Sequence, residues 1–378
     1  MQEKIRAYLA EERPPTPVLV VDLDVVATRY DKLHAALPTA EIFYAVKANP
    51  APEILRLLQA RGASFDVASP GEIDLCLEVG IDPAAISYGN TSKKRSDIAY
   101  AFERGVRLFA YDSELELEKL ADAAPGAEVF CRILTSNEGA DWPLSRKFGC
   151  DLDMASDLLA MASKLQLNPV GVSFHVGSQQ RNPGQWDAPL AQVAWLFDEL
   201  AQHDLPLSLI NLGGGFPPIY RSSVPPIADS GDAITRSLER HFYSRGRTPR
   251  IIAEPGRYLV ADAGVIATEV VLVARKAYTE DLRWIFVDIG RYGGLAETEG
   301  EAISYMISTP HDGGPTGPVV IAGPTCDSVD VMYEQTPYHL PLALAEGDIL
   351  HLLSAGAYTS TYASVAFNGF PPLRVVCL

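Results

Sequence analysis

Short apolar or β-branched runs alternate with helix-length amphipathic segments from residue 41 to residue 257. This alternation is typical of a parallel sheet whose strands are connected by helices. It predicts helices such as Pro52 to Arg61 and Gly71 to Val79, and strands near residues 41–48, 64–69, 86–90, 108–112, 128–134, 169–178, 208–215 and 250–257. Eight strands with eight crossovers is the count of a (β/α)8 barrel. An open doubly wound sheet fits the same pattern, because periodicity does not show closure.

The pattern changes after about residue 260, where strand-like runs replace the helical periodicity. These runs lie near residues 265–276, 284–289, 319–322, 348–354 and 374–378, and they predict a mostly β domain. The early apolar run Pro17 to Asp22 precedes the barrel strands, and pairing with the tail would bring both chain ends into one domain. We therefore expect an α/β barrel over residues 24–260 and a β domain formed by residues 1–23 and 261–378.

Composition narrows the classes of partner. The 378-residue chain is 47% hydrophobic and carries a formal net charge of -17, which argues against nucleic acid or an anionic membrane surface and suits a small cationic substrate. No apolar stretch reaches 18 residues, and the charged N-terminus is unlike a signal peptide, so we predict a cytoplasmic protein. Five cysteines without CxxC spacing predict neither a disulfide framework nor a metal site.

Three segments carry candidate chemistry. Lys47 ends an apolar run, where a partly desolvated amine titrates low and attacks a carbonyl to form an imine. Gly213 to Gly215 let backbone N–H groups approach a phosphate, although a flexible turn has the same composition. Glu254 lies where a carboxylate would keep a pyridine nitrogen protonated, and Arg257 follows it. The ordinary alternative is that Glu254 is a surface acid before a Pro-Gly turn. Together the three segments are the parts that a pyridoxal phosphate (PLP) enzyme requires.

Further candidates lie at predicted strand ends. Catalytic groups of a (β/α)8 barrel lie at the carboxyl ends of its strands, and phosphate is often bound after strands seven and eight. Asp66 ends the second predicted strand, Arg132 lies in the fifth, and His175 to Ser178 close the sixth. We predict that His175 stacks on a planar cofactor and that Ser178 contacts phosphate. The ordinary alternative for His175 is a core histidine whose ring is hydrogen-bonded to backbone.

Two polar turns of the predicted β domain, Gly323 to Asp330 and Gly356 to Tyr358, are either ordinary hairpin connections or parts of the site. In the second case Cys326 would be a proton donor beside Asp327, whose carboxylate would bind an ammonium group. The polar segment Asp141 to Gly149, which includes Pro143 and Arg146, is long enough to form a mobile lid. The alternative is an ordinary surface loop.

In this order, seven motifs resemble the fold-type III PLP-dependent decarboxylases, and most closely the ornithine decarboxylase family. The motifs are Phe43 to Asn49, Phe65 to Ser69, His175 to Ser178, Gly213 to Phe216, Glu254 to Arg257, Gly323 to Asp327 and Gly356 to Tyr358. The resemblance implies an alanine-racemase-like architecture, in which a PLP-binding barrel accompanies a β domain built from both chain ends.

The resemblance also implies roles for the barrel residues. Lys47 would form the imine with the cofactor aldehyde, His175 would stack on the pyridine ring and Glu254 would bind its nitrogen, while Asp66 and Arg132 would support the ring surroundings. The phosphate would be bound by Ser178, Gly214, Gly215, Gly256, Arg257 and Tyr358.

The implied protein is a homodimer with shared active sites. Cys326 and Asp327 would enter the site of the partner subunit, and Lys147 and Asp330 match positions that pair across the interface. Phe367 would lie near the substrate carboxylate. Tyr358 would contribute to substrate binding as well as to phosphate binding.

The implied reaction is decarboxylation of L-ornithine to putrescine and CO2, a step of polyamine biosynthesis. The segment Arg291 to Glu301 departs from the family pattern that supplies a second substrate-binding aspartate, and Glu297 or Glu301 would replace it. Lysine, giving cadaverine, therefore stays open as a second or preferred substrate. An amino-acid racemase and a non-catalytic regulatory homologue are the other readings of the same motifs.

Overall fold

The computed structural model describes residues 1–142 and 147–378, so Pro143 and Arg146 of the predicted lid lie outside the described residues. The chain forms two compact units. One unit, the barrel unit, contains residues 28–217 and 224–258, and the other, the β unit, contains residues 1–27, 218–223 and 259–378.

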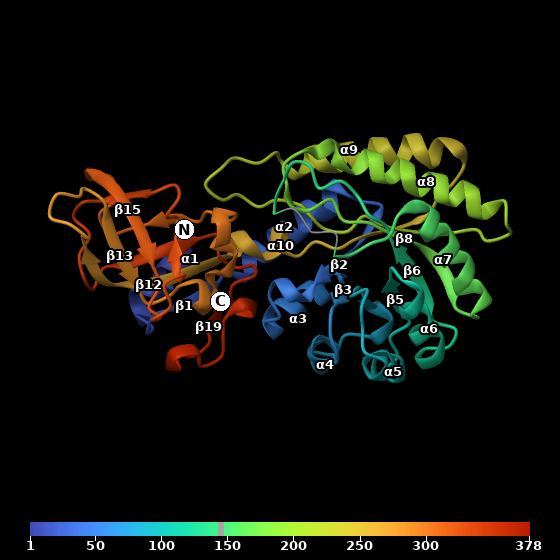
Figure 1. The fold of residues 1–378 in the computed structure, drawn as a ribbon, viewed down its shortest axis with the longest axis horizontal. Coiled ribbons are helices and arrows are strands. Elements are labelled where there is room, and N and C mark those ends of the chain that lie inside the picture. The colour runs from blue at the N-terminus through green and yellow to red at the C-terminus, as the bar shows by residue number, and fades with distance from the viewer. Residues whose placement is uncertain (143–146) are drawn as a thin grey trace. The chain divides into compact units, whose positions relative to one another are not determined.

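The barrel unit contains a closed barrel of eight parallel strands, which confirms the predicted barrel over the open sheet (Figure 1). The strands are β2 (Ala40–Ala45), β3 (Ser64–Val67), β4 (Ile86–Tyr88), β5 (Leu108–Tyr111), β6 (Glu128–Arg132), β8 (Asn168–Ser173), β10 (Leu209–Asn211) and β11 (Arg250–Ala253). Several end earlier than predicted. For example, β8 ends at Ser173, and the segment after it reaches a left-handed φ of 93° at Gly177. The predicted site residues therefore lie mostly in the loops that follow the strands.

Helices follow most of these strands and lie outside the barrel (Figure 1). Each presents one apolar face: α3 buries Ile54, Leu55 and Leu58, which share a face at helical spacing. The Ser69 side chain caps α4 by accepting from the Glu72 N–H. The helices that belong wholly or in part to this unit are α2 (Leu23–Ala36), α3 (Pro52–Ala60), α4 (Pro70–Glu78), α5 (Arg95–Glu103), α6 (Glu114–Ala123), α7 (Leu152–Lys164), α8 (Asp187–Ala201), α9 (Ile227–His241) and the short α10 (Arg257–Val260).

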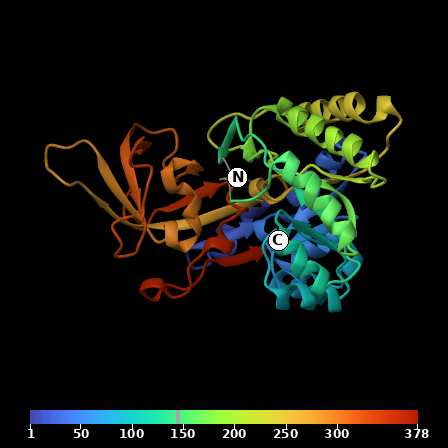
Figure 2. The ribbon, with the colours of Figure 1, turned by 45° about the vertical axis from the view of Figure 1, so that its right-hand side comes forward.

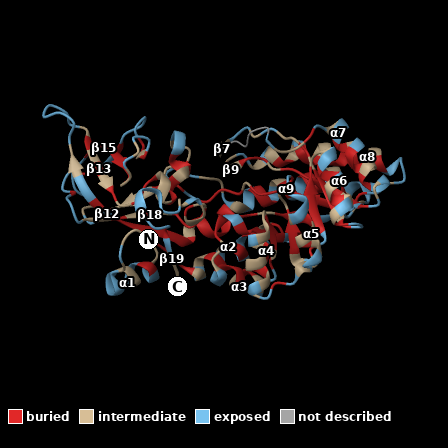
Figure 3. Ribbon diagram, turned by 60° about the horizontal axis from the view of Figure 1, so that its bottom comes forward, coloured by how far each residue is buried: buried red, intermediate tan, exposed pale blue. Residues whose placement is uncertain are grey.

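Apolar side chains fill the barrel interior. Phe43, Leu108, Phe130, Leu209 and Ile252 form one buried cluster from five different strands. Figure 3 colours the ribbon by burial, and much of the barrel unit is drawn in the red of buried residues. Burial of each large apolar side chain contributes about 1.5 to 3 kcal/mol. The filled interior leaves polar groups at the strand ends as the place for chemistry.

The β unit is built on a nine-stranded, mostly antiparallel sheet (Figure 2). Its strand β1 pairs antiparallel with β12 and parallel with β19, so both chain ends lie in one sheet, as expected from the early apolar run. Helix α1 (Glu3–Glu12) adds Ile5 to the buried cluster beneath it. The strands are β1 (Val18–Val21), β12 (Gly264–Ala274), β13 (Arg283–Val287), β14 (Met306–Ser308), β15 (Thr316–Ala322), β16 (Val331–Met332), β17 (Tyr338–Pro341), β18 (Ile349–Leu353) and β19 (Arg374–Cys377).

A separate two-stranded sheet joins β7 (Ala140–Trp142) to β9 (Ser178–Gln180) in the barrel unit. Among the described residues, no helix combines the length and the apolar character needed to cross a membrane.

Candidate active site

Lys47 and Asp66 form an ion pair between neighbouring barrel strands. Lys47 lies in the 3-10 turn η1 (Val46–Ala48) directly after β2, and its Nζ lies 2.8 Å from Asp66 Oδ2. Asp66 is buried, whereas the Lys47 side chain is 48% exposed. The prediction was a partly desolvated lysine at the end of the first strand; the side chain is about half-exposed, and Lys47 lies in the turn just beyond the strand, which ends at Ala45. The turn carries its side chain beyond the end of the packed interior.

The opposite side of the Asp66 carboxylate is closed by backbone. A Cβ on Gly89 would lie 2.1 Å from Asp66 Oδ1, so only glycine fits there. Among the described residues, this buried oxygen has no hydrogen-bond partner. Glu72 also contributes to the charge around Asp66 and Lys47. Its carboxylate accepts from the Ala68 N–H at 2.7 Å, and burial raises its pKa. The prediction missed Glu72, which the capping spacing Ser69-x-x-Glu72 could have suggested.

Glu254 follows β11, where its side chain is bound to the end of β10 and its backbone to the loop after β10. Its N–H donates to the Gly213 carbonyl at 2.8 Å, and its Oε1 accepts from Asn211 Nδ2 at 2.5 Å. Burial raises the pKa of Glu254 to about 7, Asp66 adds to the rise, and Lys47 and Asn211 oppose it. Sequence analysis missed Asn211, although a polar residue ending an apolar strand before the glycines was a usable signal.

The His175 ring is neutral and held in one tautomer. Its Nδ1 accepts from the Gly177 N–H at 3.0 Å, which leaves the proton of the neutral ring on Nε2. Burial lowers the pKa of His175 to about 3, and the charges of Arg132 and Lys47 lower it further. The Thr135 hydroxyl donates to the His175 carbonyl at 2.9 Å and fixes the backbone. The His175 ring is therefore flat and uncharged, and it lies within the electrostatic influence of Lys47 and Arg132.

Glycines let three loops meet backbone to backbone. Gly213 and Gly215 have φ values of 65° and 104°, which disfavour residues with side chains. A Cβ on Gly214 would lie 2.6 Å from the Glu254 carbonyl oxygen. Beside this glycine cradle, buried Arg257 donates from Nε to Ser178 Oγ at 3.1 Å. Backbone N–H groups, a hydroxyl and a guanidinium together form a donor set suited to phosphate.

The barrel residues fit the cofactor that the sequence predicts. An amine is available for an aldehyde, a neutral ring for stacking, a carboxyl with a raised pKa for a pyridine nitrogen and the glycine cradle for a phosphate. The structure brings these predicted residues to one end of one barrel: Lys47, Asp66, Arg132, His175, Ser178, Gly214, Gly215, Glu254, Gly256 and Arg257.

A second group of predicted residues gathers in the β unit. Exposed Cys326 donates its N–H to Asn368 Oδ1 at 3.0 Å. Asp327 accepts from the Val329 N–H at 3.0 Å and from the Tyr292 hydroxyl at 2.9 Å, and both bonds lower the pKa of its carboxyl. The Tyr292 and Phe367 ring centroids are 4.6 Å apart. Sequence analysis assigned no role to Tyr292, which links Asp327 to Phe367.

Asp330 organises the loop that carries Cys326 and Asp327. Its buried carboxylate accepts from the Thr325 hydroxyl and from the Arg291 N–H, each at 2.7 Å. These contacts lie within the β unit. The predicted pairing of Asp330 with Lys147 of a second subunit stays a prediction.

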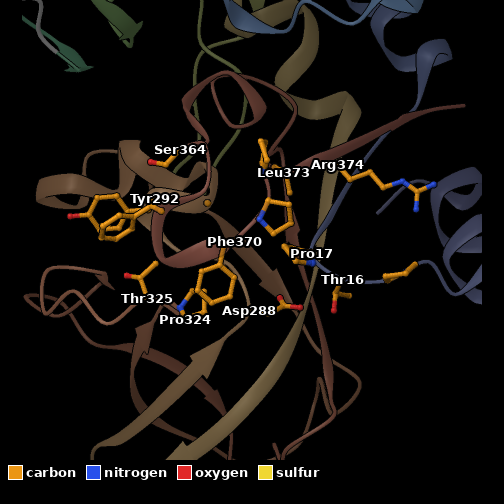
Figure 4. Close-up of a pocket in the computed structure, with 15 residues that line it drawn as sticks. Thr16, Pro17, Asp288, Tyr292, Pro324, Thr325, Ser364, Phe370, Leu373 and Arg374 are labelled. Atoms are coloured by element: carbon orange, nitrogen blue, oxygen red, sulfur yellow. The ribbon is translucent and has the colours of Figure 1, made fainter.

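A cavity of about 320 Å³ opens beside this loop in the β unit (Figure 4). Proline and aromatic residues line much of it, among them Pro324, Phe367 and Phe370, and Asp288 contributes a carboxylate. Tyr292 also lines the cavity, so the residue that holds Asp327 faces an apolar space.

The β unit also contains the remaining predicted site residues, and each of them has different contacts. Glu297 is buried in the turn η7 (Ala296–Glu301). Glu301 Oε1 accepts from the N–H groups of Gln335 and Thr336, at 2.7 and 3.0 Å, so this oxygen caps a neighbouring turn. Tyr358 follows β18 with a φ of 54°, and its ring centroid lies 5.9 Å from that of Tyr362. Their roles toward substrate and phosphate stay predictions.

Comparison with known proteins identifies the class. A family model described as "Pyridoxal-dependent decarboxylase, pyridoxal binding domain" matches residues 23–261. A lysine/ornithine decarboxylase of Selenomonas ruminantium is 35% identical over 371 residues, covering 98% of this chain and 91% of the relative. An ornithine decarboxylase of Schizosaccharomyces pombe is 35% identical over 369 residues, covering 95% and 82%. The solved lysine/ornithine decarboxylase of Vibrio vulnificus, complexed with cadaverine, is 32% identical with a TM-score of 0.88, covering 99% of this chain and 97% of that chain.

The chain belongs to the fold-type III PLP-dependent decarboxylases, as the motifs predicted. It is a PLP-dependent decarboxylase of basic amino acids, and both the predicted cofactor and the predicted reaction class are confirmed.

Proposed function

We propose that this protein decarboxylates L-ornithine to putrescine and CO2, with L-lysine as a second substrate that gives cadaverine. The observation that supports this choice is the Asp327 carboxylate beside Cys326. Hydrogen bonds from Tyr292 and Val329 keep it ionised, so it suits the distal ammonium of a diamino acid.

The proposed barrel roles follow from the surroundings of each group. PLP, when bound, supplies an electron sink for the electron pair left by CO2. The Lys47 amine would hold the cofactor through its aldehyde. Glu254, with its raised pKa, holds a proton at the pyridine nitrogen. The neutral His175 ring would stack on the cofactor ring, and it would add no positive charge beside the pyridine nitrogen. The glycine cradle and Arg257 bind the phosphate.

The residues of the β unit complete the proposed reaction. Phe367 presents an apolar ring to the substrate carboxylate, and desolvation of that carboxylate favours its loss because charge disperses in the transition state. The Cys326 thiol donates the proton that replaces CO2 at Cα. Asp327 holds the distal ammonium and gauges the length of the substrate.

We also propose a homodimer in which Cys326 and Asp327 of one protomer serve the barrel of its partner. The support is that the two groups of residues lie in different units of the chain and that Cys326 is exposed. The cytoplasmic location stays a prediction.

Steady-state kinetics on ornithine, lysine, arginine and diaminopimelate, with CO2 and diamine identified as products, tests the proposal. We expect the highest kcat/KM for ornithine, a lower value for lysine, and a loss of about 10³-fold or more in kcat for Lys47→Ala. Exposed Lys94→Ala is the matched control and keeps wild-type rates. Preference for arginine or diaminopimelate would contradict the substrate assignment. Racemised amino acid without CO2 would indicate a racemase, and failure to bind PLP would indicate a non-catalytic homologue.

A further inference from the structure

Asn211 connects two parts of the cofactor site that follow different barrel strands, β10 and β11. It is the last residue of β10, and its side chain is fully buried. Its Nδ2 donates to Glu254 Oε1 at 2.5 Å, and its Oδ1 accepts from the Gly213 N–H at 3.0 Å. One amide therefore contacts both the acid and the first glycine of the cradle.

A backbone contact closes this arrangement into a ring. The Gly213 carbonyl accepts from the Glu254 N–H at 2.8 Å. The three residues are thus joined by three hydrogen bonds, two of which use the Asn211 side chain. The Gly213 N–H requires an acceptor, so Oδ1 is assigned to it and Nδ2 must face Glu254.

We propose that Asn211 is a positioning residue that fixes the orientation of Glu254 and the conformation of the glycine cradle together. The inference rests on the proposed roles of Glu254 and the cradle. Because both ends of the cofactor site depend on one side chain, loss of Asn211 affects the pyridine contact and the phosphate contact at once.

The amide is suited to this place because it donates without adding charge. Glu254 already faces the charges of Asp66, Lys47 and Arg132. Donation from Asn211 stabilises the carboxylate of Glu254 and opposes the effect of burial on its pKa. An aspartate would still accept from the Gly213 N–H, but when ionised it could only repel Glu254.

Two variants separate the two contacts. Asn211→Leu is close in volume and removes both hydrogen bonds, whereas Asn211→Asp keeps the acceptor for Gly213 and removes the donor to Glu254. We would titrate each apoprotein with PLP between pH 6 and pH 9 without any amino-acid substrate. This readout is independent of the proposed substrate, so a wrong substrate assignment would leave it unchanged.

We expect Asn211→Leu to weaken PLP binding by about 10- to 100-fold across the range, the size expected for two buried hydrogen bonds. Asn211→Asp should bind near wild-type strength at low pH, where the two carboxyl groups share a proton, and progressively more weakly at high pH. A purely structural role would weaken binding equally at every pH. Thermal unfolding of the apoproteins verifies that each variant is folded.

Asn182→Ala is the matched control, because it removes another Asn-to-glycine backbone contact, the 3.0 Å bond from the Gly184 N–H, at an exposed turn. It should leave PLP affinity within about twofold. The proposal is overturned if folded Asn211→Leu binds PLP as tightly as wild type, or if the pH profile of Asn211→Asp is parallel to that of wild type.

Discussion

At the scale of single residues, Glu254 occupies a poor place for a negative charge. Burial and the nearby Asp66 raise its pKa to about 7, and the hydrogen bond from Asn211 only partly compensates. Such a group lowers stability wherever it must ionise, so its presence calls for a chemical reason. Protonation of a pyridine nitrogen is that reason in our proposal. His175 fits the same view, because burial keeps its ring neutral with a pKa of about 3, far below the ordinary value for histidine.

The effect of the raised Glu254 pKa on the pH dependence of stability can be measured in the apoprotein. The folded-state pKa of Glu254, about 7, lies above its ordinary value of 4.5, so its contribution to stability is present below pH 4.5 and is lost as the pH rises through 7. Glu254→Gln removes this loss. We expect the stability advantage of the variant over wild type in urea unfolding to be small at pH 5 and to grow by about 1 to 3 kcal/mol between pH 5 and pH 8. Decarboxylation should be strongly reduced in the variant.

Exposed Glu138→Gln is the control for that measurement and should show no such difference between the two pH values. Equal stability of Glu254→Gln and wild type at pH 8 would contradict the assigned burial cost. His175 and Lys93 also titrate with shifted pKa values, but both are present in each protein and cancel in the comparison.

At the scale of elements, the loop after β10 is specified by close backbone contacts together with the side chain of Asn211. Gly214 lies against the Glu254 carbonyl, and Gly213 and Gly215 adopt left-handed φ values. The loop of Gly323 to Asp330 uses a different device, since the buried Asp330 carboxylate collects its N–H and hydroxyl donors. Both loops are therefore held before any ligand binds.

Gly214→Ala tests the close approach. The added Cβ would meet the Glu254 carbonyl oxygen at 2.6 Å and His175 Nε2 at 3.4 Å, so one of the loops must move. We expect PLP affinity to fall by at least about 10-fold and the apoprotein to lose about 1 to 3 kcal/mol of stability. PLP titration and thermal unfolding measure the two effects. Gly71→Ala, whose Cβ would meet only Ser69 Oγ at 3.8 Å, should change neither.

At the scale of the whole molecule, the candidate chemistry is divided between the two units of the chain. Lys47, His175 and Glu254 belong to the barrel unit, whereas Cys326 and Asp327 belong to the β unit. In the proposed homodimer each site takes one group from each protomer. Such an arrangement makes complementation between two inactive variants a direct measurement of site sharing.

Mixing Lys47→Ala with Cys326→Ala tests this arrangement. Random reassociation makes half of the dimers mixed, and each mixed dimer holds one intact site, so we expect recovery of about a quarter of wild-type activity. Mixing Lys47→Ala with Glu254→Ala is the control and should recover none, because both changes lie in the barrel unit. Equal recovery from both mixtures, or from neither, would contradict shared sites. Size-exclusion chromatography checks that the protomers exchange.

The sequence by itself determined the parallel strands, the mostly β tail, the order of the motifs and the class of enzyme, because periodicity and short motifs are local properties of the chain. Closure of the barrel and the contacts around the site were decided only by the tertiary structure. Asn211 and Glu254 are 43 residues apart, and their hydrogen bond exists because β10 and β11 are neighbours in the closed sheet. The turn after β2 likewise decided how far the Lys47 side chain is exposed, since the apolar run alone indicated only partial desolvation.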